Sequence, residues 1–242
     1  MARIVVTTLV GLFVMMAHPP RAHAFAPCAG MVGLAPASTA VLPPRPRLVY
    51  FAERPGTPAF AASIDGEPVT VDVKPLSNGY PHLVELRIDS ARTGRLEVTA
   101  TPPGADAGTR VVLGTYTIER RPRVRRVTAV IHRYVASRGM HSSGPEQVDA
   151  LALQFASTAP VAYLTVKLRR DDGGPWTTLL TPVAAEGRAR IPMALIGELG
   201  CRASFPVALL EGGVDITVKA TLASGKTVTV DGVPARVTLP PR

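Results

Sequence analysis

Long apolar runs, asparagine, cysteine and tryptophan are all scarce in this chain of 242 residues. The one long apolar run without a charge, residues 4–17, is shorter than the stretch of about 20 residues that crosses a bilayer as a helix. No second such run follows, so we expect no membrane span once the N-terminal segment is removed. Asn78 is the only asparagine, and it lies outside an N-x-[ST] pattern, which excludes N-glycosylation.

The N-terminal segment has the three zones of a secretory signal peptide. Arg3 supplies the positive charge, the run 4–17 is apolar, and Ala22 and Ala24 are the small residues that a cleavage site requires. We therefore predict a signal peptide over 1–24, cleaved before Phe25. Together with a bias to Arg, Ala, Pro, Gly and Val, this indicates export to the periplasm or cell surface of a Gram-negative bacterium with a GC-rich genome.

Cys28 and Cys201 are the only two cysteines. A lipid anchor on Cys28 is disfavoured, because Pro27 precedes it and the apolar run ends well before it. Disulfides persist in exported proteins, and two cysteines in such a chain are most simply a pair. We predict a Cys28–Cys201 disulfide, with two unpaired thiols as the alternative.

Helical periodicity is weak, and short runs rich in Val, Thr and Ile recur between turn residues. Residues 193–200 alone suggest one or two helical turns. In 68–73, Val69, Val71 and Val73 are expected to share one face. Hairpin turns are predicted at 171–174 and 224–226. The predicted strands are 47–52, 59–64, 68–73, 82–88, 95–101, 110–118, 124–135, 149–155, 162–169, 176–180, 189–193, 215–222, 226–230 and 235–239.

This spacing of strands is typical of β-sandwiches, and each half of the chain has enough strands for one. Pro122 breaks strand pairing between the halves. The predicted fold class is therefore all-β, with two tandem sandwiches after the signal peptide. The predicted divisions are an N-terminal segment at 25–45, a first sandwich at 46–121 and a second at 122–242.

Residues 35–121 resemble bacterial Ig-like domains of exported and surface-layer proteins. A proline, a short polar stretch, a Val-x-Pro and a strand ending in an aromatic residue carry the resemblance. The matching residues are Pro36, Thr39, Val41, Pro43, Leu48, Val49 and Phe51. The second half is similar in style. The resemblance implies Ig-like sandwiches with a spacer or binding role, and it implies no catalytic residues.

The formal net charge of +9 becomes +7 without Arg3 and Arg21 of the predicted signal peptide. A basic surface favours anionic partners such as nucleic acid, phospholipid or lipopolysaccharide headgroups and acidic polysaccharide, whereas the alternative is that the charge serves solubility alone. Arginines concentrate between the halves, where guanidinium groups suit phosphate and carboxylate. They are either an anion-binding patch or a solvated linker. No aromatic residue beside them provides for base stacking, so specific nucleic-acid binding is not expected. These residues are Arg120, Arg121, Arg123, Arg125 and Arg126, with Arg133 beyond them.

No catalytic motif is complete. Residues 224–227 end like a P-loop, but Ala220 stands where a phosphate cradle needs glycine. His141 lies beside two serines, yet no G-x-S-x-G elbow is present. Trp176 is expected in a core or half-buried in a hairpin, because one ring alone does not form a sugar site. We expect a protein that is not an enzyme and needs no cofactor.

Histidines give the one metal hypothesis. His132 and His141 could meet if the chain folds back between them, although zinc needs three or four converging ligands. The alternative is that these residues and His82 are surface histidines at strand ends. Cleavage before His23 would instead create an N-terminal copper chelate. The sequence thus predicts an exported non-enzymatic binding or structural module of the bacterial envelope, with a periplasmic copper carrier as the alternative. Its expected partner is an anionic envelope component or another protein.

Overall fold

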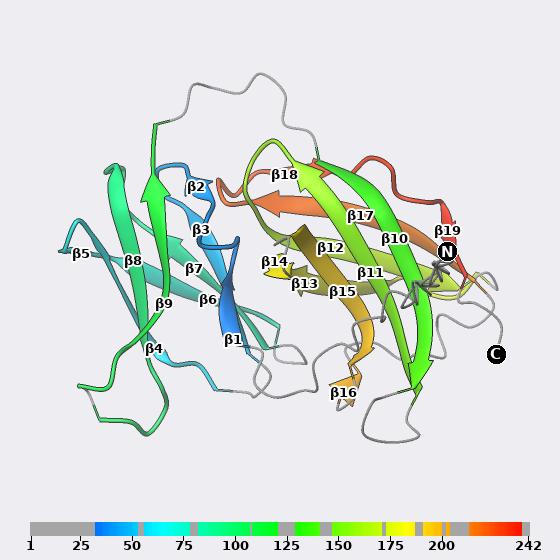
Figure 1. The fold of residues 1–242 in the computed structure, drawn as a ribbon, viewed down its shortest axis with the longest axis horizontal. Helices are drawn as coiled ribbons and strands as arrows, with labels where there is room; N and C mark the ends of the chain where they lie inside the picture. The colour runs from blue at the N-terminus through cyan, green and yellow to red at the C-terminus, as the bar shows by residue number, and fades with distance from the viewer. Residues whose placement is uncertain are drawn as a thin grey trace, which may run out of the picture.

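The computed structural model describes residues 32–238, except 53–55, 78–81, 107, 121–128, 141–146, 171–172, 187–190, 200–201 and 204–212. Its regular elements are strands throughout the described part of the chain (Figure 1). No described helix is long and apolar enough to span a bilayer. The predicted all-β fold class is confirmed.

Two sheets build the first sandwich. Sheet A has the strand order β1-β3-β7-β6, and sheet B has the order β2-β9-β8-β4-β5. β2 pairs in parallel with β9, and the other ladders are antiparallel. The strands are β1 Val32–Ala35, β2 Val41–Leu42, β3 Arg47–Ala52, β4 Ala59–Ile64, β5 Glu67–Val69, β6 Val71–Ser77, β7 His82–Ile88, β8 Gly94–Thr101 and β9 Val111–Ile118.

Two further sheets build the second sandwich. Sheet C has the order β10-β11-β15-β14, with β16 paired to β15, and sheet D has the order β13-β12-β17-β18, with β19 paired to β17. For β10, β14, β15, β16 and most of β11 only the backbone is described. The strands are β10 Ala129–Met140, β11 Gln147–Ser157, β12 Val161–Arg170, β13 Thr177–Pro182, β14 Ala184–Glu186, β15 Ile191–Leu199, β16 Arg202–Ala203, β17 Val214–Leu222, β18 Thr227–Thr229 and β19 Arg236–Val237.

The strand orders are those of Ig-like sandwiches. If the strands of each sandwich are lettered along the chain in the Ig convention, one sheet reads A-B-E-D and the other contains C, F and G as neighbours. Both sandwiches have this order. Their sheets lie face to face as two layers, with sheet C in front of sheet D in the view of Figure 1.

The first core lies between sheets A and B. Side chains alternate along β7, where Val84, Leu86 and Ile88 enter this core whereas Leu83 faces the other way. Tyr50 and Phe60 meet edge to face across the core, with 5.1 Å between ring centroids. Such aromatic contacts add to the stabilisation from buried apolar area.

The second core is lined on its sheet D side by alternate residues of β12 and β17, as period-two strands require. The β17–β18 connection is a hairpin turn, as predicted, with Gly225 at φ 81°. β12 pairs antiparallel with β13, and the N–H of Gly173 between them donates to the carbonyl of Arg170 over 3.2 Å, whereas residues 171–172 of the predicted turn lie outside the described part of the chain. The core residues on these two strands are Val161, Leu164, Val166, Leu168, Val214, Ile216, Val218, Ala220 and Leu222.

Three features differ from the sequence prediction. The predicted strand 68–73 is two strands, because the chain crosses at Thr70 from β5 in sheet B to β6 in sheet A. Val69 and Val71 still pack on the first core, but Val73 is 38% exposed at the edge of sheet A. The helical turns predicted at 193–200 are wrong, because 193–197 pair with β11 within β15. Neither β1 nor β2 was predicted within 25–45.

Candidate functional site

Most of the predicted site residues lie outside the described part of the chain. These are Cys28, Cys201, Arg121, Arg123, Arg125, Arg126 and His141. Arg120 is described and is exposed just after β9. His132 is the extra residue of a β-bulge in β10, where the register to β11 shifts between Ile131 and Arg133. The disulfide, the arginine patch and the His132–His141 metal pair therefore stay predictions.

His82 is not on the surface, and the expectation for it is wrong. It is 7% exposed at the start of β7, because this strand lies between β3 and β6 within sheet A. Its Nε2 lies 3.3 Å from Oγ1 of Thr57, and its Nδ1 is buried without a hydrogen-bond partner in the described structure. Within the described residues, no three His, Cys, Asp or Glu side chains converge as a metal site would need.

The most extensive feature that sequence reasoning missed is a junction between the two sandwiches. Sheet A carries apolar side chains on its outer face as well as on its core face. Val49, Phe51 and Leu83 form a buried cluster there with Ala35 and with Ala162 of the second sandwich. Both Val49 and Ala162 are fully buried. Leu76, Tyr163 and Leu180 pack around the same cluster.

Two β-bulges deliver residues to this junction cluster. The ladder from β6 to β7 shifts between Pro75 and Ser77, and the ladder from β12 to β17 shifts between Val161 and Tyr163. The extra residues are Leu76 and Ala162, one from each sandwich. A bulge re-aims a side chain relative to its strand, and here both re-aimed side chains belong to the cluster.

The turn between β17 and β18 forms the second part of the junction. The backbone N–H of Arg47 donates to the carbonyl of Ala223 over 2.7 Å. Ala223 is fully buried and belongs to the core cluster of the first sandwich. A Cβ at Gly225 would lie 2.4 Å from Nε of Arg47. The turn thus needs glycine for its positive φ, and a larger residue there would also displace the guanidinium of Arg47.

A buried carboxylate completes the junction. Glu85 is 2% exposed on the outer face of sheet A, and its Oε1 accepts a hydrogen bond from Nε of Arg87 over 2.5 Å. Nη1 of Arg47 lies 3.6 Å from the same oxygen. The hydrogen bond and charge of Glu85 raise the pKa of Arg87 above its ordinary value, and the charge of Asp72 adds to this. A buried charge is tolerated when it is paired in this way.

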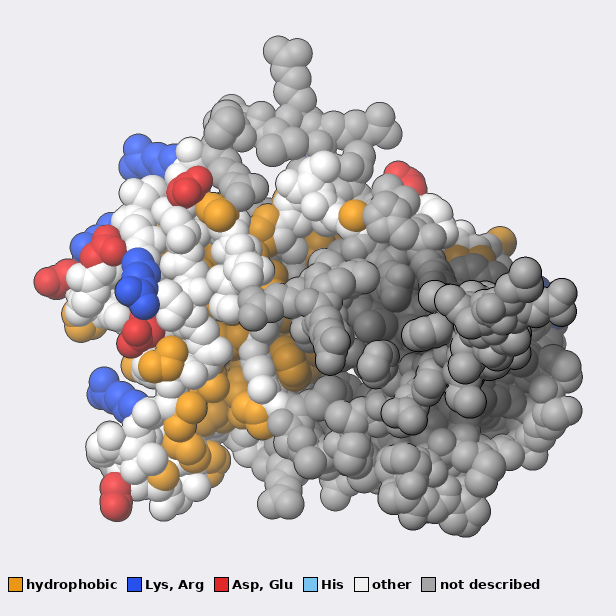
Figure 2. Space-filling view, in the orientation of Figure 1, with side chains coloured by type: hydrophobic (Ala, Val, Ile, Leu, Met, Phe, Trp, Pro, Cys, Tyr) orange, Lys and Arg blue, Asp and Glu red, His pale blue; other side chains and the backbone are white. Residues whose placement is uncertain are grey.

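Charged side chains are unevenly distributed on the face of the first sandwich that Figure 2 shows. In Figure 2, Lys, Arg, Asp and Glu side chains gather on the side away from the second sandwich, and hydrophobic side chains lie closer to it. The junction therefore continues the apolar character of the interior. It fixes the end of sheet D, where β12 begins and β17 ends, against a sheet face.

A second feature lies at the opposite end of sheet D. The guanidinium of Arg169 stacks on Trp176 with 4.8 Å to the ring centroid, and its Nη2 donates to Oδ2 of Asp215 over 2.7 Å. Trp176 is 42% exposed just before β13, so it is not a core residue. Residues 224–227 form a hairpin turn, and Ala220 lies within β17, which leaves no helix to complete a phosphate cradle.

No family model and no curated protein matches the chain. Solved structures do match it over most of its length. The titin domains Z1Z2 in complex with telethonin share 16% identity with it, covering 87% of this chain and 95% of that one at a TM-score of 0.24. The D0-D1 domain of intimin shares 12% identity, covering 86% and 99% at a TM-score of 0.23. The strand orders of the two sandwiches identify the fold independently of these neighbours.

Proposed function

We propose that this chain is an exported, non-enzymatic module of the bacterial envelope in which two Ig-like sandwiches are joined as one stiff unit. The observation that carries the proposal is the junction, in which the outer face of sheet A is buried beneath the end of sheet D. Glu85, Val49 and Ala162 are each at most 2% exposed there. Inter-domain surfaces of flexible tandems are usually more polar than this.

A stiff module suits a structural or binding role. It holds its exposed faces at fixed separations, so that a partner meets one surface and not two independent domains. The signal-like segment 1–24 supports export, and the resemblance to bacterial Ig-like domains supports a place in the envelope. The copper-carrier alternative rests on His23, His132 and His141, whose side chains lie outside the described part of the chain.

The substitution Ala162→Glu tests the stiffness. Ala162 has no exposed surface at the junction, so a carboxylate there must either push the sandwiches apart or remain unpaired. We expect the wild-type chain to unfold in one calorimetric transition and the variant in two, with a larger radius of gyration by small-angle scattering. Ala59→Glu is the matched control, because Ala59 is exposed in β4.

Two results would overturn the proposal. One is a wild-type chain whose sandwiches already unfold in two separate transitions. The other is an unchanged scattering profile for Ala162→Glu when circular dichroism shows that both sandwiches remain folded.

A further inference from the structure

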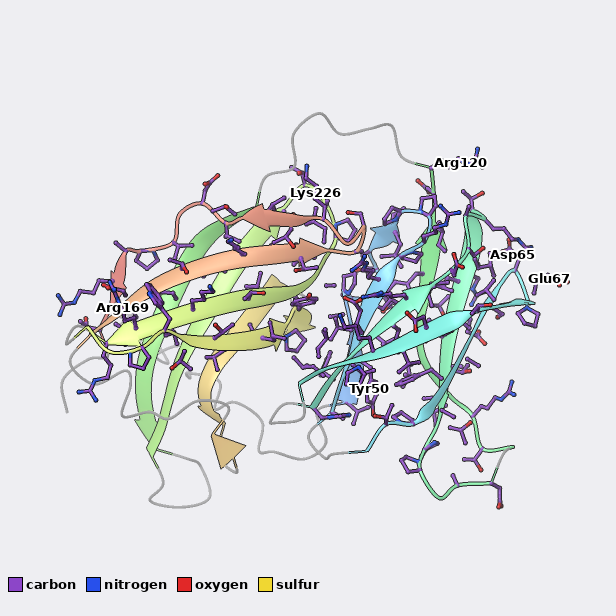
Figure 3. All side chains as sticks on the ribbon, turned by 180° about the vertical axis from the view of Figure 1, so that it is seen from behind. Tyr50, Asp65, Glu67, Arg120, Arg169 and Lys226 are labelled. Carbon is purple, nitrogen blue, oxygen red and sulfur yellow. The ribbon has the colours of Figure 1, made fainter. Side chains whose placement is uncertain are left out.

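The outer face of sheet D is the side that faces away from sheet C, and Figure 3 views it from the front. Alternate residues of β12 and β17 fill the second core, so the residues between them lie on this outer face. β12 runs from the junction to Arg169 at the far end of the sheet. The outer-face residues on the two central strands are Tyr163, Thr165, Lys167, Arg169, Asp215, Thr217, Lys219 and Thr221.

Two exposed lysines occupy the middle of this face. Lys167 lies opposite Thr217 in the register of β12 and β17, and Lys219 lies opposite Thr165. Lysine and threonine therefore alternate along both strands, and the two ammonium groups are diagonal neighbours. The structure gives neither lysine an ion-pair partner within the part of the chain that it describes.

Threonine hydroxyls surround the lysines. Thr178 lies opposite Lys167 on β13, and Thr229 lies opposite Lys219 on β18. Both are exposed, as is Thr217. A hydroxyl is a donor and an acceptor at once, so the face offers hydrogen bonds of either kind beside each positive charge.

Trp176 stands at the far end of the same face in a fixed orientation. Asp215 holds Arg169 through both Nη2, at 2.7 Å, and Nε, at 3.3 Å. Arg169 in turn stacks on the indole, an arrangement that its planar guanidinium favours. An indole that keeps 42% of its surface in solvent forgoes part of its hydrophobic stabilisation. The chain therefore positions a ring that it does not bury.

We propose that the outer face of sheet D binds an acidic polysaccharide. The C–H face of one sugar ring lies on Trp176, sugar hydroxyls bond to the threonines, and carboxylate or sulfate groups meet Lys167 and Lys219. The inference deepens the proposed function and rests on it, since it names the ligand class of a binding module.

The composition of the face favours a polysaccharide over other polyanions. Nucleic acid would call for several aromatic rings on which successive bases stack. Of the two rings on this face, Tyr163 packs against the junction cluster, which leaves Trp176 as the exposed one. Asp215 lowers the net charge of the face, which disfavours a ligand as densely charged as DNA. An anionic bilayer is held by clusters of four to eight Lys and Arg residues. This face carries Lys167, Arg169, Lys219 and Arg236, and Arg169 among them is already paired with Asp215.

The chain contains one tryptophan, so its fluorescence reports on this face directly. We expect polygalacturonate, titrated into the full chain, to shift Trp176 emission in a saturable manner, and dextran to leave it unchanged. The double variant Lys167→Glu, Lys219→Glu should bind about tenfold more weakly, since two attractions become repulsions. The double variant Arg92→Glu, Arg110→Glu makes the same charge change at exposed sites of the first sandwich and should bind as wild type.

Several outcomes would overturn the inference. They are no fluorescence response to polygalacturonate, an equal response to dextran, or undiminished binding by the double lysine variant at a wild-type thermal midpoint. Equal affinity for single-stranded poly(dT) or for phosphatidylglycerol vesicles would assign the face to another class of ligand. The Ala162→Glu experiment is scored by unfolding and scattering, so failure of the stiff module and failure of this face are distinguishable.

Discussion

The hydroxyl of Tyr116 donates a hydrogen bond over 3.0 Å to the carbonyl of Pro36, which precedes it by 80 residues. Tyr116 is 2% exposed in β9. Gly114 lies against its ring, where a Cβ would approach to 3.0 Å. The bond ties the segment between β1 and β2 to the core of the first sandwich.

Tyr116→Phe should lower the free energy of unfolding by about 1 to 2 kcal/mol at pH 8, because the Pro36 carbonyl loses its donor while buried. Urea unfolding with tryptophan-independent detection, such as circular dichroism, measures this. A variant as stable as the wild type would show that the hydrogen bond contributes nothing net.

Alkaline pH should lower the stability of the protein through Tyr116. Burial raises the pKa of Tyr116 well above its ordinary value of 10.0, so the folded state holds the phenolic proton more tightly than the unfolded state. The resulting stabilisation is complete below pH 10 and is lost above it, by about 1.4 kcal/mol per pH unit. Burial also raises the pKa of Tyr50, which adds to the loss. We expect the difference between wild type and Tyr116→Phe to shrink between pH 8 and pH 11. A difference that stays constant over this range would contradict the raised pKa.

Gly94→Ala should be strongly destabilising. Gly94 has φ 136°, and a Cβ there would lie 2.1 Å from Oδ2 of Asp65, whose Oδ1 accepts from the N–H of Arg95. The backbone strain of alanine at this φ and the displacement of Asp65 should together lower the free energy of unfolding by about 2 kcal/mol. Gly108→Ala is the control, since it has no atom within 4 Å of the added Cβ. Equal melting temperatures for the two variants would disprove the reasoning.

Glu85→Ala should destabilise the junction by about 1 to 2 kcal/mol, because it leaves Arg47 and Arg87 without their shared partner. The loss is limited because both arginines are more than one-third exposed and solvent screens them. Glu85→Leu should recover part of it by packing. Asp72→Ala is the control, expected within about 0.5 kcal/mol of wild type because Asp72 is exposed. The idea fails if Asp72→Ala lowers the free energy of unfolding, measured in denaturant, more than Glu85→Ala does.

The pairing of Cys28 with Cys201 is a prediction for the covalent structure. Closing so long a loop lowers the conformational entropy of the unfolded chain. In the entropic treatment this stabilises the folded state by about 5 kcal/mol. Peptide mapping without reduction should recover the two cysteines in one cross-linked peptide. Alkylation of both thiols in the folded, unreduced protein would refute it.

The local parts of the fold were predictable from the sequence. β3, β4 and β7 coincide with the predicted segments to the residue, because alternation and turn residues are signals contained within each strand. The failure at 193–200 has the opposite origin, since the pairing with β11 decides that segment and its own sequence does not.

The junction was not predictable by the same means. Val49, Phe51 and Leu83 look like the second face of ordinary strands, and nothing local says what covers that face. A signal was present, however. "LVYFA" in β3 is a continuous run without a charged residue, which indicates a strand buried on both faces. The bulges at Leu76 and Ala162 arise from the register between paired strands, and no residue pattern within either strand predicts them.

The doubly covered sheet A also bears on where the chain can be cut. A fragment that ends after β9 would keep all of its own core except Ala223 but would turn Val49, Phe51 and Leu83 out to water. Contiguous apolar patches of this kind promote self-association. Such a fragment would be prone to aggregate even though every strand of its sandwich is present, and its behaviour would misrepresent the same residues in the whole protein.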